Sequence, residues 1–216
     1  MTNLTRLQLL GGVAAMPLFF LIALGLASTR EGFDLRRHFL SQLSAGDLGW
    51  IQMANFVLVG GLYVLCAIAM GRVVAPGRAA IWGPRLIGVF GVCLIAAGVF
   101  VADPANGYPV GYAEAEPSWH SMAHGIAALT AGLALTAATF VFAARFVAQR
   151  RVGWAVFSAL SGAVYFVLPW TNLELSSLLL PVASVIGWGW VSIVAWQLAA
   201  RPSAAVAVGT SRAQPA

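Results

Sequence analysis

The sequence contains no lysine and few charged residues of any kind. Only 9% of the 216 residues are charged, whereas 60% are hydrophobic and the mean hydropathy is +0.86. A soluble domain carries about 25% charged residues. The shortage excludes an ordinary soluble protein, because so much apolar surface cannot be hidden in a core of this size. It indicates that lipid solvates most of the chain.

Cysteine is scarce, and the arginines form no cluster. Cys66 and Cys93 both fall within apolar stretches, so we expect buried free thiols and no disulfide framework. The net charge of +5 comes from arginines at the ends of apolar segments. This distribution is typical of a membrane protein that obeys the positive-inside rule, and it excludes nucleic acid as a partner.

Six apolar segments are long enough to cross a bilayer, which takes about 20 residues each. They cover residues 8–28, 51–71, 86–102, 119–144, 152–170 and 178–199. Short connections join them, as in a bundle of antiparallel neighbours. The sequence therefore predicts an all-α integral membrane bundle of six transmembrane helices, in a single domain over residues 1–200. Residues 201–216, rich in Ala, Pro and Ser, are expected to form a disordered cytoplasmic tail.

Arginines and acidic residues sort to opposite ends of this bundle. Nine arginines lie at one end; they are Arg6, Arg72, Arg78, Arg85, Arg145, Arg150, Arg151, Arg201 and Arg212. The other end carries all seven acidic residues, the three histidines, and Arg30, Arg36 and Arg37. Because arginine-rich connections stay in the cytoplasm, we expect both termini there and residues 29–50, 103–118 and 171–177 outside.

Small and polar residues within the spans predict how the helices pack. Gly125, Ala128 and Gly132 share one face of the fourth span, where small side chains would let a neighbouring helix approach closely. Gln52 and Asn55, one turn apart in the second span, are expected to form hydrogen bonds with another helix.

The first outer connection contains an amphipathic segment at residues 33–43. Its apolar positions are Leu35, Phe39 and Leu43, and its polar positions are Asp34, His38 and Ser41. Both sets follow helical spacing, which predicts a short helix lying in the outer interface with its apolar side in lipid. The alternative is that the segment only links and anchors two spans.

Three histidines and one aspartate are candidate metal ligands. His120 and His124 are one turn apart at the start of the fourth span, where the helix N-terminus favours the neutral imidazole that coordinates metal. Asp103 ends the third span, where a carboxylate calls for a compensating cation. With His38 from the first connection, these residues predict a site for zinc or another transition metal. Alternatively, the histidines form hydrogen bonds with their neighbours and Asp103 is a solvated helix end.

The catalytic roles are less constrained. The HxxxH pattern lacks the internal glutamate of HExxH, so the general base would be Asp34, Glu116 or Glu174. Asp103 would be a metal ligand or would orient water. Ser41 and Ser44 are candidate nucleophiles, although no nucleophile elbow surrounds either one.

Five stretches resemble a known family. They are HFLSQLS (residues 38–44), GWIQMANF (49–56), PRLIGVFG (84–91), DPANGYP (103–109) and WHSMAH (119–124). Together they resemble the bacterial membrane family catalogued as domain of unknown function 998. The resemblance implies six helices in the bacterial inner membrane, and it implies no particular activity.

A second resemblance concerns the candidate site alone. The ordered set consists of His38, Ser41, Asp103, His120 and His124. It is similar to the serine, aspartate and three histidines around zinc in the superfamily of alkaline ceramidases and adiponectin receptors. Those hydrolases have seven spans and carry HxxxH in the last, so the resemblance implies a shared chemistry and not a shared fold.

Two functions fit these observations. The first is a metal-dependent hydrolase that acts on a lipid or lipid-like amphiphile entering from the outer leaflet. The second is a non-catalytic membrane protein, such as a small transporter, a sensor or a partner subunit, whose outer polar cluster is structural. The absence of ionisable residues from the middle of every span weighs against transport.

Overall fold

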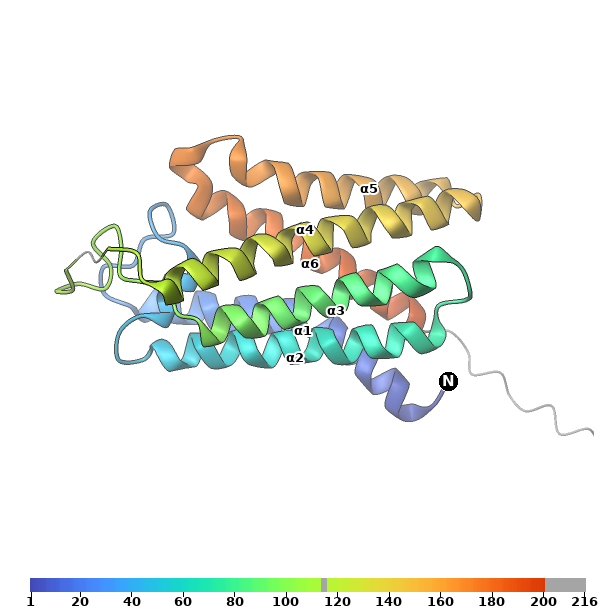
Figure 1. The fold of residues 1–216 in the computed structure, drawn as a ribbon, viewed down its shortest axis with the longest axis horizontal. Helices are drawn as coiled ribbons and strands as arrows, with labels where there is room; N and C mark the ends of the chain where they lie inside the picture. Colours follow the sequence, from blue (N-terminus) through green and yellow to red (C-terminus); the bar gives the residue numbers. More distant parts are fainter. Residues whose placement is uncertain (114–115, 201–216) are drawn as a thin grey trace, which may run out of the picture.

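The described residues fold into a bundle of long helices (Figure 1). The structure is a computed structural model and describes residues 1–113 and 116–200. The six helices are α1 (Asn3–Thr29), α2 (Gly49–Val73), α3 (Arg78–Val99), α4 (Trp119–Ala148), α5 (Val152–Val167) and α6 (Ser176–Ala199). Three short 3-10 helices accompany them: η1 (Leu40–Ser44), η2 (Leu168–Trp170) and η3 (Leu173–Leu175). Each predicted span coincides with one helix, which confirms the predicted fold class. The expected tail at 201–216 lies outside the described residues.

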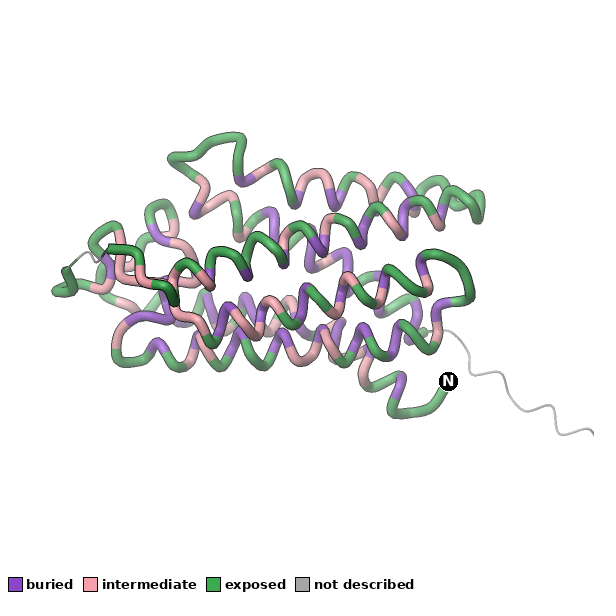
Figure 2. The backbone as a smooth tube through the Cα atoms, in the orientation of Figure 1, coloured by how far each residue is buried: buried purple, intermediate pink, exposed green. Residues whose placement is uncertain are grey.

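The outward faces of the helices are apolar. Leu21 on α1 is 74% exposed and Ile126 on α4 is 66% exposed, and exposed residues recur along the whole length of the bundle (Figure 2). All six spans are long and apolar enough to cross a membrane. Large apolar side chains at this exposure are stable in lipid but not in water. The chain is therefore a multi-pass membrane protein.

Successive helices pack closely through glycine and through a buried amide. A Cβ atom built on Gly60 of α2 would lie 2.6 Å from the Gly91 carbonyl oxygen of α3, so the two backbones are in contact. Asn55 Nδ2 donates hydrogen bonds to the Phe19 carbonyl of α1, at 3.0 Å, and to Gln52 Oε1, at 3.1 Å. The bond to Phe19 confirms the expected interhelical hydrogen bond for Asn55. Gln52 bonds only to Asn55 of its own helix, and its Nε2 has no partner among the described residues.

The small-residue face of α4 is not a helix contact, and that prediction is wrong. A Cβ atom added to Gly125 or to Gly132 would meet no atom of the described residues within 4 Å. α5 packs against other parts of α4, where Gly162 lies against Thr139. The face of Gly125, Ala128 and Gly132 borders open space instead.

The continuous helix expected over 33–43 is not found. The N–H groups of Arg37 and His38 donate to the Asp34 carbonyl in a tight turn, at 2.9 and 2.8 Å, Phe39 is extended, and η1 follows. Side-chain hydrogen bonds explain the break. Gln42 Oε1 accepts from the Phe39 N–H at 2.8 Å and Gln42 Nε2 donates to the Ala105 carbonyl at 3.0 Å. Such bonds compete with the helical ladder for the same backbone groups.

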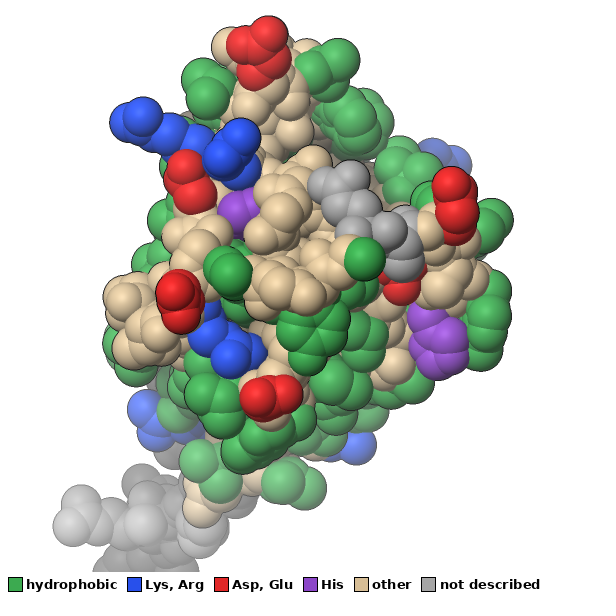
Figure 3. Space-filling model, turned by 90° about the vertical axis from the view of Figure 1, so that its left-hand side faces the viewer, with side chains coloured by type: hydrophobic (Ala, Val, Ile, Leu, Met, Phe, Trp, Pro, Cys, Tyr) green, Lys and Arg blue, Asp and Glu red, His purple; other side chains and the backbone are tan. Residues whose placement is uncertain are grey.

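The two ends of the bundle differ in charge. We call the end formed by residues 30–48, 100–113, 116–118 and 168–175 the acidic end, and the end formed by residues 74–77 and 149–151 the basic end. Figure 3 views the acidic end, where acidic side chains and histidines lie among apolar and polar ones. Trp50, Trp119 and Trp170 are exposed around it, as in the aromatic belt of a membrane interface.

Candidate functional site

The four predicted metal ligands do not meet. Among residues 1–113 and 116–200, no group of three or more His, Cys, Asp or Glu side chains could hold a metal ion. His38, Asp103, His120 and His124 are at the acidic end, as expected, but each has different partners. A bound transition metal stays a prediction from the sequence.

His38 has a structural role. Its ring is 3% exposed and packs beside Phe33 and Tyr108. Nδ1 accepts a hydrogen bond from the Asp34 N–H at 2.9 Å, and Nε2–H donates to the Asn106 carbonyl at 3.0 Å. A ring that accepts at one nitrogen and donates at the other is neutral, and no lone pair remains for a metal. His38 therefore ties the 103–109 loop to the turn at 34–38.

The two predicted catalytic acids also bond to backbone. Asp103 accepts from the Ser118 N–H at 2.6 Å and from the Ser118 hydroxyl at 2.8 Å, and Ser118 in turn caps α4. Asp34 accepts from the Arg36 N–H at 2.9 Å. Each carboxylate thus fixes a chain segment. Neither is among the described residues that line the cavities below.

His120 lies on the exposed side of α4. Its ring centroid is 3.8 Å from that of Trp119 and 5.9 Å from that of Phe100. His124, one turn later, is 8% exposed and faces into the bundle. The two histidines therefore occupy different environments despite their spacing.

Burial raises the pKa of Tyr108 in the neighbouring 103–109 loop, and the charge of Arg30 opposes that rise.

The imidazole of His124 is oriented by the end of α3. Its Nδ1 lies 2.9 Å from the Ala97 carbonyl oxygen and 2.8 Å from that of Phe100. Both carbonyls can only accept, so Nδ1 carries the proton and, in the neutral ring, Nε2 carries a free lone pair. These carbonyls belong to the last turn of α3 and its C-cap, where helix carbonyls lack intrahelical partners and carry negative partial charge. They hold the ring as a carboxylate holds the histidine in a catalytic triad.

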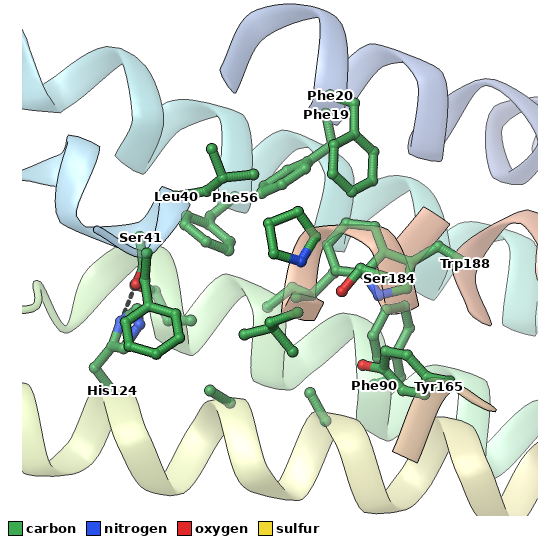
Figure 4. A pocket seen from close by; sticks show the side chains of 17 residues that line it. Phe19, Phe20, Leu40, Ser41, Phe56, Phe90, His124, Tyr165, Ser184 and Trp188 are labelled. Carbon is green, nitrogen blue, oxygen red and sulfur yellow. Dashed lines mark hydrogen bonds between the residues drawn. The ribbon is translucent and has the colours of Figure 1, made fainter. Parts of the chain in front are cut away.

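The hydroxyl of Ser41 faces the imidazole of His124. Figure 4 shows the two side chains pointing toward one another, Ser41 from η1 and His124 from α4. Ser41 is half-buried, and both residues line the same two hollows. A hydroxyl beside a histidine whose other nitrogen is anchored is the arrangement of a nucleophile and its general base.

Two apolar hollows meet at this pair. The first, which we call the inner cavity, has a volume of about 120 Å³ and is lined by aromatic and aliphatic side chains such as Phe19, Phe90 and Trp188. The second, the lateral groove, has a volume of about 370 Å³. The groove runs along Gly125 and Gly132 of α4 and along the outer parts of α5 and α6. The residues shared by both hollows are Phe39, Ser41, His124, Ala128, Tyr165 and Leu180.

The glycines of α4 create the groove. Because Gly125 and Gly132 have no side chain, the space beside this face is filled by no neighbour among the described residues. Phe166, Pro169 and Trp170 line the facing wall, where α5 gives way to η2. The result is a hollow at the membrane-facing side of the bundle that reaches Ser41 and His124.

Comparison with known proteins supports one of the two resemblances. A model of the family described as "Protein of unknown function (DUF998)" matches residues 13–209. The chain belongs to this family. No curated protein and no solved structure matches the chain. The similarity of the candidate site to alkaline ceramidases and adiponectin receptors is not shown by these comparisons. Ser41 and His124 both fall in stretches on which the resemblance to the family rests, at 38–44 and 119–124.

The sequence indicates both residues but does not pair them. The HxxxH spacing predicts His124 as a metal ligand, and no motif predicts a base for Ser41. No spacing rule connects η1 to α4, since their approach depends on how the connections at the acidic end fold. The spacing of the HxxxH turn gives no signal that separates the two histidines, because residues i and i+4 lie on the same side of a helix.

Proposed function

We propose that this membrane protein is a hydrolase that cleaves an ester or amide bond of a lipid or other amphiphile, with Ser41 as nucleophile and His124 as general base. The observation that carries the proposal is the Ser41 hydroxyl facing His124 where two apolar hollows meet. The acidic end would lie outside the inner membrane of a bacterium, with both termini cytoplasmic, as the distribution of arginines favours.

The proposed reaction has two halves. The Ser41 oxygen attacks the substrate carbonyl while His124 Nε2 takes the hydroxyl proton. The tetrahedral intermediate then breaks its bond to the leaving alcohol or amine, which takes the proton from the imidazolium and leaves an acyl group on Ser41. In the second half, water attacks this ester as His124 takes a proton from it, and the return of that proton to Ser41 releases the acid. The carbonyls of Ala97 and Phe100 keep the ring oriented throughout.

The lateral groove explains how an amphiphile would reach the pair. A lipid chain can enter it from the membrane without crossing water, because the groove walls are apolar and lie on the lipid-facing side of α4 and α5. The reacting carbonyl would then stop near Ser41, at the acidic end.

A metal-dependent form of the reaction finds less support. Both nitrogens of His38 and both oxygens of Asp103 are engaged by neighbouring groups, so these residues do not fit a metal in this arrangement. The hydrogen bonds of His38 and Asp103 give the loops of the acidic end a structural role. They therefore also support the second candidate function, a non-catalytic membrane protein.

A covalent probe tests the proposal. Purified protein should react with an alkyl fluorophosphonate, and the adduct should map to Ser41, because the phosphorus accepts an activated serine oxygen and the alkyl chain suits the groove. Ser41→Ala should remove labelling. Ser184→Ala is the matched control, since Ser184 lines the inner cavity next to Trp188 and away from His124 (Figure 4). Absence of any Ser41 adduct, or equal labelling of Ser41→Ala, would remove the basis of the proposal.

A further inference from the structure

A third hollow, polar rather than apolar, lies at the acidic end. It has a volume of about 500 Å³ and we call it the headgroup cavity. It is lined by Arg36, Arg37, Phe39, Asn106, Leu173, Glu174, Ser176 and Ser177. It lies between the turn at 34–38, the 103–109 loop and the first turn of α6.

We propose that the headgroup cavity binds the phosphate of an anionic phospholipid whose acyl chain occupies the lateral groove. The binding step stands on the cavities alone. Only the conclusion that this lipid is the substrate rests on the proposed function of Ser41.

The charge of the cavity suits an anion. Arg36 and Arg37 are exposed, and no described carboxylate pairs with either guanidinium. Glu174 is the single acid in the lining, so two cations outnumber one carboxylate. Arginine binds phosphate through paired N–H donors in a planar fork, which makes adjacent arginines a common phosphate site. The positive-inside rule disfavours arginine in outer loops, so a binding role would account for the position of these two residues.

The first turn of α6 adds donors to the same cavity. The helix begins at Ser176, and no side chain caps it. The Ser176 N–H donates to the Leu173 carbonyl of η3, and Ser176 and Ser177 place the positive partial charge of the helix N-terminus at the wall of the cavity. Ser177 is 4% exposed as a residue and lines the cavity, so its hydroxyl is available as a further donor at this wall.

Phe39 connects the polar and apolar hollows. It lines the headgroup cavity, the lateral groove and the inner cavity, and Ser41 follows two residues later in the chain. A molecule with a phosphate at one end and an alkyl chain at the other would pass over Phe39. In a glycerophospholipid, the ester bond lies between these two parts, which places it beside Ser41 and His124.

Lipid titration of the purified full-length protein in detergent tests this site. Phosphatidylglycerol should bind saturably, more tightly than phosphatidylcholine, and glycerol phosphate should not displace it. The double variant Arg36→Gln, Arg37→Gln should bind phosphatidylglycerol about tenfold more weakly, because both charged donors are lost. The matched control is Arg72→Gln, Arg78→Gln, which makes the same charge change on exposed arginines of the opposite end. Its affinity should stay within about twofold.

Three results would overturn the headgroup site. These are equal affinities for the two lipids, equal weakening in the two double variants, and full displacement by glycerol phosphate, which would make the ligand a soluble phosphate. The reaction of Ser41 with the fluorophosphonate separates this proposal from the hydrolase. If Ser41 forms no covalent adduct but binding depends on Arg36 and Arg37, the lipid site stands and the hydrolase falls.

Discussion

Replacing His124 with asparagine should slow hydrolysis of a long-chain ester by about 10²- to 10⁴-fold while leaving the protein folded. The asparagine Nδ2 can occupy the place of the imidazole Nδ1 and donate to the Ala97 and Phe100 carbonyls, so the contact with the end of α3 is preserved. The variant lacks an equivalent of Nε2, and no other His, Asp or Glu of the described residues lines the two hollows that contain Ser41. The rate would be measured on protein in lipid nanodiscs with a fluorogenic ester.

The matched control is His120→Asn, one turn earlier on α4. His120 is exposed and stacks on Trp119, outside the two apolar hollows. Its replacement should change the rate less than about threefold, since surface substitutions rarely have large effects. An equal loss of hydrolysis rate in both variants would show that the two histidines act together, as in a metal site. It would contradict the division of roles between them.

Filling the lateral groove should block long substrates without unfolding the protein. Gly132→Leu adds a side chain where a Cβ meets no described atom within 4 Å, so the leucine can occupy the groove. Hydrolysis of a long-chain ester should fall by at least about tenfold, whereas a short-chain ester should be hydrolysed nearly as before. A bulky group in a substrate pocket excludes chains that need that space and spares those that do not.

A glycine in a true helix contact should behave in the opposite way. In Gly91→Leu, the new Cβ would lie 2.7 Å from the Gly60 carbonyl oxygen, so α2 and α3 must separate. Overpacking costs about 1–3 kcal/mol, and a thermal melt in detergent should show the loss. If Gly132→Leu destabilises the protein as much as Gly91→Leu does, the face of α4 is packed against another helix and the groove does not exist.

The fold could be predicted because hydropathy is a property of each segment by itself. The six spans, the buried Cys66 and the hydrogen bond from Asn55 to another helix follow from composition and spacing, whereas Cys93, also expected to be buried, is partly exposed. The small-residue face of α4 could not be assigned in this way. Gly125 and Gly132 permit either a close helix contact or a hollow, and only the position of the neighbouring helices decides between them.

The candidate site depended on contacts that sequence spacing does not contain. His38 and Asp103 have the chemistry of metal ligands, but in the structure they form hydrogen bonds with backbone groups of the loops at the acidic end. The segment at 33–43 has helical spacing, yet Gln42 and His38 bind the backbone and break the helix. Hydrogen bonds between side chain and backbone thus engage His38, Asp103 and Gln42 in ways that residue type and periodicity do not predict.

Trapping the acyl intermediate tests the central claim most directly. Protein turning over a long-chain ester would be quenched with acid and digested, and its peptides would be analysed by mass spectrometry. We expect the acyl group on the peptide containing Ser41, and none on that peptide in His124→Asn within the same reaction time. Steady hydrolysis with no acyl group on Ser41 would contradict the account, because water would then attack the substrate directly and Ser41 would not be the nucleophile.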